Sequence, residues 1–200
     1  MAFGYYISAF LCAYFVGSFP TAYLLLKIRY KKDIRTSGSG NVGALNALRS
    51  TKSKTIGLIV LAVDLLKGVI PVYLAGRFYP ENDMLQIFAI TGVLYGHCFP
   101  VWLKFKGGRG LASTAGALFV FQPLLVVFWV VLWSVYYIMI RRHIVANLIA
   151  TFVLPLLVFL LQGKLFNDNT LLMILPVCLI ILLRHLERIP DVIMESLDKN

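Results

Sequence analysis

Long apolar runs alternate with short polar segments along the whole 200-residue chain. A helix that crosses a membrane needs about 20 predominantly apolar residues, so runs of this kind indicate membrane spans. The pattern predicts seven spans, at residues 4–27, 55–75, 84–103, 111–123, 124–140, 144–162 and 170–184. Only Gln122 and Pro123 separate the fourth run from the fifth, so one long tilted helix there, giving six spans, is the alternative.

The distribution of basic residues decides between these two topologies. Of the 19 Lys and Arg residues, only Lys67, Arg77 and Lys164 lie outside the first, third and fifth gaps and the C-terminal segment. Basic residues concentrate in cytoplasmic loops. Seven spans therefore place these segments in the cytoplasm and the N-terminus outside, whereas six would put the Arg141 and Arg142 pair on the opposite side.

The composition supports this class of protein and limits its partners. Hydrophobic residues make up 60% of the chain, and the mean hydropathy of +0.82 is far above that of a soluble domain. The net charge of +10 suits anionic lipid headgroups, and because the basic residues lie in short loops we expect no nucleic-acid binding. We predict an all-α, polytopic integral membrane protein with seven transmembrane helices and a single domain over residues 1–200.

Three polar clusters contain Arg, Lys or His, the first two together with glycine, and the predicted topology places all of them on the cytoplasmic side. They are SGSGNVGALNALR (37–49), GHCFPVWLKFKGGRG (96–110) and RHLERI (184–189). Glycine lets backbone N–H groups approach an anion closely, and Arg presents a fork of donors that fits phosphate oxygens. The clusters therefore predict a site for a phosphate-bearing substrate. The alternatives are a flexible solvated connector for the first cluster and interfacial anchors for the other two.

The candidate site residues fall into three groups. The first cluster supplies the candidate phosphate ligands Gly38, Gly40, Asn41, Asn46 and Arg49, together with Ser39 as a candidate catalytic group. The second supplies Lys104, Gly107, Gly108, Arg109 and Gly110, directly before a predicted helix N-terminus, which is a favourable place for an anion. His97 and His185 are candidate catalytic residues, because imidazole takes up and releases protons near neutral pH. We predict no metal site, since His97 and Cys98 are adjacent and lack ligand spacing.

Two charges interrupt the second predicted span. Asp64 and Lys67 lie three residues apart near its middle, a spacing that permits an ion pair on one helical face. A charge at that depth costs roughly 2.5 to 3.5 kcal/mol, which makes a functional role the default interpretation. An internal pair that only fixes helix packing is the alternative. We assign both residues a supporting role, orienting the loop residues.

Five motifs, taken in order, resemble those of the bacterial membrane acyltransferases that use acyl phosphate to acylate glycerol 3-phosphate. They are GSFP (17–20), D-I-R-x-x-G-S-G-N-x-G-A-x-N-x-x-R (33–49), D-x-x-K-G (64–68), G-H-x-x-P (96–100) and F-x-G-G-[KR]-G (105–110). The resemblance implies transfer of a fatty acyl group from acyl phosphate to glycerol 3-phosphate, giving lysophosphatidic acid and phosphate in the first step of phospholipid synthesis. It also implies a bacterial cell membrane location, an active site facing the cytoplasm, and no cofactor beyond acyl phosphate as co-substrate.

On this resemblance, Ser39, Asn41 and Arg49 would bind one phosphate, and Arg109 with residues 107–110 would bind the other. The H-x-x-x-x-D signature of acyl-CoA-dependent acyltransferases is absent after all three histidines.

The third motif departs from the family pattern. The family has R-H-x-x-N-I followed by G-x-E, whereas Arg188 stands at the Asn position here, and Glu195 and Leu197 stand at the Gly and Glu positions. Arg188 cannot accept a hydrogen bond as Asn does. A paralogue with another acceptor or little activity is one alternative. The charges within the second span leave a transporter or binding protein for a phosphorylated metabolite as the other.

Overall fold

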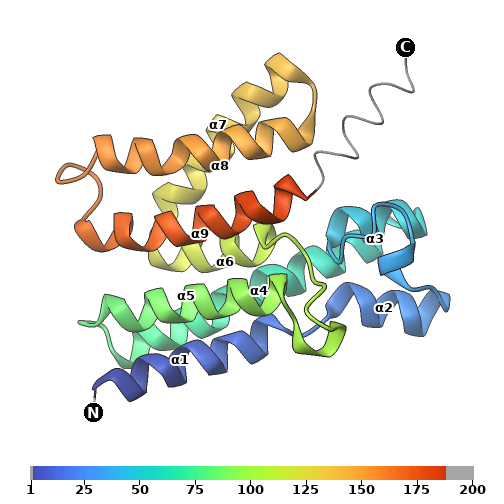
Figure 1. Ribbon diagram of the computed structural model, residues 1–200, viewed down its shortest axis with the longest axis horizontal. Helices are drawn as coiled ribbons and strands as arrows, with labels where there is room; N and C mark the ends of the chain where they lie inside the picture. Colours follow the sequence, from blue (N-terminus) through green and yellow to red (C-terminus); the bar gives the residue numbers. More distant parts are fainter. Residues whose placement is uncertain (1, 188–200) are drawn as a thin grey trace. The chain divides into compact units, whose positions relative to one another are not determined.

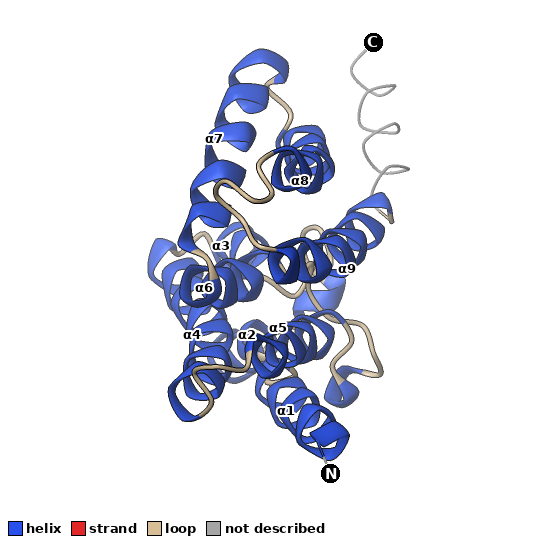
Figure 2. Cartoon of the chain, turned by 90° about the vertical axis from the view of Figure 1, so that its left-hand side faces the viewer, coloured by secondary structure: helices blue, strands red, loops and turns tan. Residues whose placement is uncertain are grey.

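The computed structural model describes residues 2–187, where the regular elements are nine α-helices and two short 3₁₀ helices (Figure 1). In chain order they are α1 (Ala2–Gly17), α2 (Thr21–Tyr30), η1 (Ile34–Thr36), α3 (Ala44–Thr51), α4 (Lys54–Phe78), α5 (Asp83–Cys98), η2 (Val101–Leu103), α6 (Leu111–Phe121), α7 (Pro123–Ile140), α8 (His143–Leu160) and α9 (Asp168–Leu186). Figure 2 shows these helices joined by loops. They form two compact units, the first ending at Pro123 and the second beginning at Leu124. The predicted all-α class is confirmed.

Six helical segments in the described part of the chain are long and apolar enough to cross a membrane. They are Phe3–Tyr30, Lys54–Phe78, Asp83–Leu103, Pro123–Ile140, His143–Leu160 and Asp168–Leu186. The remaining predicted span is α6, whose 11 residues extend over about 16 Å, roughly half of a hydrocarbon core. α6 and α7 are separate helices, so the alternative of one continuous helix from 111 to 140 is wrong. The count of seven crossings stays a prediction.

Two of the predicted spans are not single helices, and a proline explains the interruption in both. Residues 4–27 are not one helix, because α1 ends at Gly17 and α2 begins at Thr21. Residues 84–103 are not one helix either, because α5 ends at Cys98. A proline follows each helix, at Pro20 and Pro100. Proline has no N–H to donate and disfavours helical backbone in the residue before it.

Glycines allow close helix contacts inside the first unit. Gly92 and Gly96, one turn apart on α5, face the backbone carbonyls of Phe10 and Tyr14 on α1, and a Cβ at either glycine would collide with them. Small residues at this spacing let membrane helices approach one another. The Tyr14 hydroxyl also donates to the carbonyl of Phe99 at 2.9 Å. The end of α5 that carries the second polar cluster is therefore held firmly against α1.

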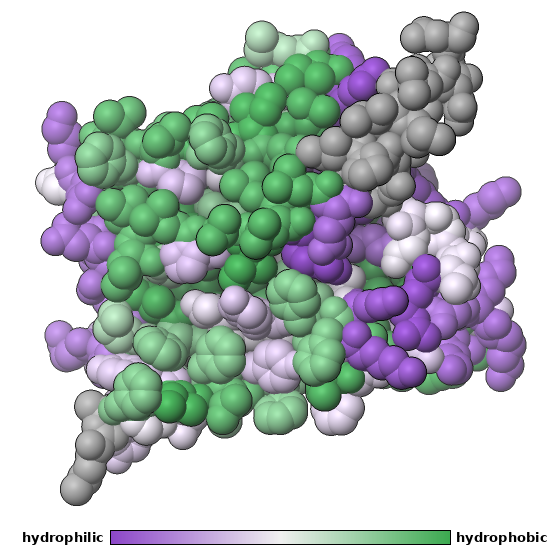
Figure 3. Space-filling view, viewed as in Figure 1, coloured by the Kyte–Doolittle hydropathy of each residue, from purple (hydrophilic) through white to green (hydrophobic). Residues whose placement is uncertain are grey.

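Hydrophilic residues gather at one end of the first unit. In Figure 3, apolar surface covers the middle of the helices, and hydrophilic surface covers the end at which α2 and α3 lie. The segment from α2 to the start of α4 carries eight of the basic residues: Lys27, Arg29, Lys31, Lys32, Arg35, Arg49, Lys52 and Lys54. The first polar cluster lies within this basic end.

The second unit consists of α7, α8 and α9. α8 packs along α9, and the indole N–H of Trp129 on α7 donates to the hydroxyl of Thr151 on α8 at 3.0 Å. Along α7 the ring of Trp133 stacks on that of Tyr137, and the ring of His143 stacks on Tyr137 with 4.2 Å between centroids. Leu125 is the buried residue of α7, which leaves the apolar surface of that helix available to lipid.

Candidate active site

The side chain of Asn46 organises the first polar loop. It is 2% exposed, and its Oδ1 accepts a hydrogen bond from the N–H of Ser39 at 2.9 Å. Its Nδ2 donates to the carbonyls of Ile34, Ser37 and Asn41 at 3.3, 3.0 and 2.9 Å, respectively. An Asn amide nitrogen has two hydrogens, so these carbonyls occupy its donor capacity. Asn46 therefore holds the loop in the structure, and its predicted role as a phosphate ligand stays a prediction.

Glycine at position 38 is required by this arrangement. Gly38 has a φ of +57°, and a Cβ there would collide with the carboxamide oxygen of Asn46. The fixed loop leaves the neighbouring candidates Ser39 and Asn41 half-buried, while Arg49 is exposed on α3. The loop thus presents two half-buried polar residues and one exposed guanidinium, the kinds of group that can bind a phosphate.

An ion pair precedes this loop. Asp33 accepts a hydrogen bond from the backbone N–H of Arg35 at 2.9 Å, and an Oδ2 to Nη2 distance of 2.7 Å pairs the two side chains. Hydrogen bonding from the Arg35 side chain holds the pKa of Asp33 below its ordinary value of 3.8. A lowered pKa means that the pair stabilises the fold near neutral pH and that this contribution is lost as the pH falls below 3.8.

We therefore expect Asp33→Asn to lower thermal stability slightly at pH 7, by less than about 1 kcal/mol, because both side chains are about one-third exposed. The difference from the unsubstituted protein should shrink as the pH falls below 3.8. Thermal unfolding of both proteins in the same detergent, at pH 7 and in steps down to pH 3, measures this. A difference that stayed constant over that range would contradict an ionic contribution from Asp33.

The second polar loop turns sharply against His97. The N–H of Gly108 donates to the carbonyl of His97 at 3.0 Å, and the N–H of Gly107 donates to the carbonyl of Cys98 at 3.1 Å. A Cβ at Gly108 would collide with the imidazole ring of His97, and one at Gly107 would collide with the His97 carbonyl. The backbone can lie directly on the histidine only because both positions are glycine.

The residues on either side of this turn are also constrained. Lys104 and Phe105 both have positive φ, 53° and 62°, a conformation that costs free energy in residues other than glycine. Gly110, with a φ of 82°, is the N-cap residue directly before the 11-residue helix α6. Lys104 is exposed and Arg109 is half-buried, so two cationic side chains flank a turn that leads to a helix N-terminus. This combination favours an anion.

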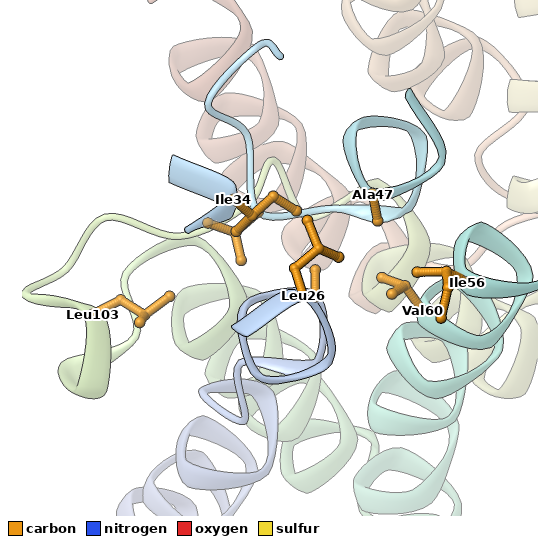
Figure 4. Packing of buried hydrophobic residues seen from close by; sticks show 8 residues of the cluster. Leu26, Ile34, Ala47, Ile56, Val60 and Leu103 are labelled. Atoms are coloured by element: carbon orange, nitrogen blue, oxygen red, sulfur yellow. The ribbon is translucent and has the colours of Figure 1, made fainter. Parts of the chain in front are cut away.

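The two polar loops rest on one shared cluster of buried apolar side chains, which we call the apolar floor. Its members are Ala22, Leu26, Ile34, Val42, Ala47, Ile56, Val60 and Leu103. Figure 4 shows that Ile34 comes from η1, just before the first loop, and Ala47 from α3, whereas Leu103 comes from the second loop. The apolar floor therefore fixes the two loops relative to each other.

A small polar pocket lies in the first unit, next to the break between α1 and α2. Its lining includes Ser18 and Thr21 from the break, Asp64 and Lys67 from α4, His97 from α5, and Val42 and Gly107 from the two polar loops. The space accessible to a water molecule is about 10 Å³, enough for about one water. The pocket thus brings together the predicted residues Asp64, Lys67, His97 and Gly107.

The predicted pairing of Asp64 with Lys67 is confirmed. Lys67 Nζ lies 2.6 Å from Asp64 Oδ1, and both side chains are almost fully buried. Lys67 Nζ also donates to the carbonyl of Phe19 at 2.7 Å. His97 Nδ1 lies 4.0 Å from the same carboxylate oxygen, beyond direct hydrogen-bonding distance.

Three features of the pocket were missed by sequence reasoning: the Phe19 carbonyl and the hydroxyls of Ser18 and Thr21. The two hydroxyls are buried and have no hydrogen-bond partner among residues 2–187. The sequence signal for these three groups was Pro20, which interrupts a long apolar run. A helix break in a membrane exposes backbone groups that need hydrogen-bond partners.

Three other candidates are not among the residues that line this pocket. Ser39, Asn41 and Arg49 belong to the first loop and do not line it. His185 belongs to α9 in the second unit, where its Nδ1 lies 2.8 Å from the Ile181 carbonyl; since a carbonyl only accepts, Nδ1 is the donor. The third-motif positions Arg188, Glu195 and Leu197 lie outside the described residues.

Three features define the class of this protein. They are apolar helices of spanning length, two glycine-containing loops with cationic side chains, and a buried charged pocket beside one of these loops. It is a helical membrane protein with a site for phosphate-bearing molecules. The chain belongs to the family described as glycerol-3-phosphate acyltransferase, whose model matches residues 7–195.

Relatives and solved structures agree with this family. A glycerol-3-phosphate acyltransferase from Pelagibacter ubique is 37% identical over 175 residues, which are 88% of this chain and 87% of the relative. One from Thermotoga petrophila is 39% identical over 176 residues, with the same two coverages. The crystal structure of PlsY (YgiH), an integral membrane glycerol 3-phosphate acyltransferase, in its glycerol 3-phosphate form matches with a TM-score of 0.83 and 29% identity, covering 95% of this chain and 92% of that one.

Proposed function

We propose that this chain transfers a fatty acyl group from an acyl phosphate to glycerol 3-phosphate, giving lysophosphatidic acid and inorganic phosphate. The observation that carries the proposal is the match, over 95% of the chain, to PlsY structures in a glycerol 3-phosphate form and a lysophosphatidic acid form. These two molecules are the acceptor and the product of a single acyl transfer. Membership of the glycerol-3-phosphate acyltransferase family supports the same acceptor.

The reaction requires no covalent intermediate on the protein. The C1 hydroxyl oxygen of glycerol 3-phosphate attacks the acyl carbonyl carbon, the bond from that carbon to the phosphate oxygen breaks, and phosphate leaves with the electron pair. The hydroxyl proton passes to a base. An acyl phosphate is already activated, so the protein has to hold two anionic substrates together and align hydroxyl with carbonyl.

The geometry supports a division of these tasks between the two loops. Ser39, Asn41 and Arg49 on the first loop would bind one phosphate, held in place by the bonds from Asn46. Arg109 and the glycine turn of residues 107–110 would bind the other. His97 or a substrate phosphate would accept the hydroxyl proton, and the catalytic role of His185 stays a prediction. The apolar floor beneath both loops would keep the two phosphate sites at a fixed separation.

The proposed membrane topology follows from the distribution of basic residues. With seven crossings, an outward N-terminus and a bacterial cell membrane, the basic end of the first unit and both polar loops face the cytoplasm. The soluble substrate glycerol 3-phosphate would reach the loops from that side. A cysteine introduced at exposed Lys52 should then react with a membrane-impermeant thiol reagent only in inverted vesicles.

Direct turnover tests the function. Protein purified in nanodiscs would be given palmitoyl phosphate and glycerol 3-phosphate, with phosphate release and lysophosphatidic acid measured together. We expect equal amounts of both products, and none with palmitoyl-CoA as donor. Phosphate release without acylated acceptor, or no turnover by folded protein, would overturn the proposal.

Removing either loop guanidinium should impair this reaction. We expect Arg49→Ala and Arg109→Ala each to reduce the rate roughly 10- to 100-fold, because a charge-assisted hydrogen bond to phosphate is worth about 1.5 to 3 kcal/mol. Arg77→Ala is the matched control, since Arg77 lies in the last turn of α4, away from both loops. Wild-type rates in both loop variants, with substrates below saturation, would contradict the assigned sites.

A further inference from the structure

The break between α1 and α2 exposes a backbone carbonyl inside an apolar segment. The 28-residue segment Phe3–Tyr30 would be one span if its helix were continuous, but residues 18–20 interrupt it. The Phe19 carbonyl accepts a hydrogen bond from the N–H of Thr21 at 3.0 Å and a second from Lys67 Nζ at 2.7 Å. Lys67 lies 48 residues further along the chain. The break is therefore bonded directly to the middle of α4.

The cation that reaches the break is itself held by a carboxylate. Asp64 Oδ1 lies 2.6 Å from Lys67 Nζ, and the two side chains are 3% and 7% exposed. A buried pair of this kind is weak evidence for stability, because apolar residues of similar volume often stabilise a protein as well or better. Its retention inside a membrane span indicates a positional role, since each charge is costly at that depth.

The same carboxylate faces the histidine on which the second loop turns. Asp64 Oδ1 is 4.0 Å from His97 Nδ1, and the opposite side of the ring lies against Gly108, where a Cβ would collide with Nε2. The backbone of the turn is bonded to the same residue, from the Gly108 N–H to the His97 carbonyl. The imidazole ring therefore stands between the buried ion pair and the glycine turn.

We propose that Asp64 and Lys67 are positioning residues that fix the Gly107 and Gly108 turn through His97, by clamping α4 to the break at Phe19 and lying directly behind the His97 ring. This inference rests on the proposed acyl transfer, in which that turn holds a phosphate. In this role neither residue needs to touch substrate. Loss of the pair removes the Lys67 bond to the Phe19 carbonyl and the carboxylate behind the His97 ring together, so the ring that supports the turn is held less firmly.

Kinetics can separate positioning from a merely structural role. Gly108→Ala disturbs the turn directly, so it identifies the substrate whose KM depends on the turn. We expect Lys67→Met to raise the KM of that same substrate by about tenfold and to leave the other KM within about twofold. The double variant Lys67→Met/Gly108→Ala should be no worse than Gly108→Ala alone, because both changes act on one element.

Two further variants protect the test against simple unfolding. Asp64→Asn/Lys67→Met removes both charges at once, so no unpaired charge is left buried, and it should fold while keeping the raised KM. Leu85→Ala is the matched control, since it removes a buried side chain at the other end of α5, about 18 Å along the helix from His97. It should lower stability and leave both KM values unchanged.

Hydrogen exchange gives a readout that does not depend on activity. The amides of Gly107 and Gly108 are hydrogen-bonded, so a peptide covering residues 104–112 should exchange faster in Asp64→Asn/Lys67→Met. Its exchange rate should be unchanged in Leu85→Ala. If the unsubstituted protein makes no lysophosphatidic acid, the proposed function fails and exchange alone tests the clamp. Unchanged exchange in the double variant, or a fall in kcat with both KM values unchanged, would overturn the positioning role.

Discussion

Replacing Gly108 with alanine is expected to reduce acyl transfer by about a hundredfold or more. The new Cβ would collide with the imidazole of His97, so either the ring or the turn must move. A misplacement of about 1 Å in a positioned site can cost about a hundredfold in rate. Initial rates with palmitoyl phosphate and glycerol 3-phosphate, each varied at a saturating level of the other, measure the loss.

The matched control for this substitution is Gly4→Ala. Gly4 lies in α1, and a Cβ there meets nothing within 4 Å. We expect full activity from this variant, which separates a general effect of replacing a membrane glycine from a specific effect on the turn. A folded Gly108→Ala protein with the unsubstituted rate would show that the second loop is not part of the active site.

Changing Asn46 to aspartate is expected to destabilise the first unit by about 2 to 4 kcal/mol and to remove most of the activity. The substitution keeps the shape of the side chain but replaces its amide donor with an oxygen that faces three backbone carbonyls. Each buried polar group left without a partner costs about 1 to 3 kcal/mol. Thermal unfolding and turnover, measured on the same preparation, give the two effects.

Leu45→Ala provides the comparison, because Leu45 is adjacent to Asn46 on α3 and is 52% exposed. That change should have little effect on stability or activity. If Asn46→Asp unfolded at the temperature of the unsubstituted protein and yet lost activity, Asn46 would be a substrate ligand after all. A matched loss of both properties would establish it as the residue that holds the loop.

The helices could be predicted from sequence because a bilayer forces the backbone to satisfy its own hydrogen bonds within long apolar runs. The pairing of Asp64 with Lys67 could be predicted for a similar reason, since a spacing of three residues puts both on one helical face. The break at Pro20 was harder to predict. The apolar run continues past Pro20, and the length of the run favours a single span. The local structure is decided instead by Pro20, which has no backbone N–H to donate.

The contacts that shape the site could not be predicted, because they join residues far apart in sequence. No pattern links Lys67 to the carbonyl of Phe19, or a carboxylate in α4 to a ring at the end of α5. For Asn46 the ambiguity is chemical, since an amide near a glycine loop can bind either a phosphate or the loop itself. The loop-holding role becomes visible only from the positions of Ile34, Ser37 and Asn41 around it.

The apolar floor has a consequence for how this protein is made. Its members span residues 22–60 and then Leu103, so the base of the first loop stays incomplete until the ribosome has passed the second loop. A nascent chain that stops before residue 103 should leave residues 37–49 open to protease, and a chain released slightly beyond that point should protect them. Assembly of the site would thus be timed by the emergence of one leucine during translation.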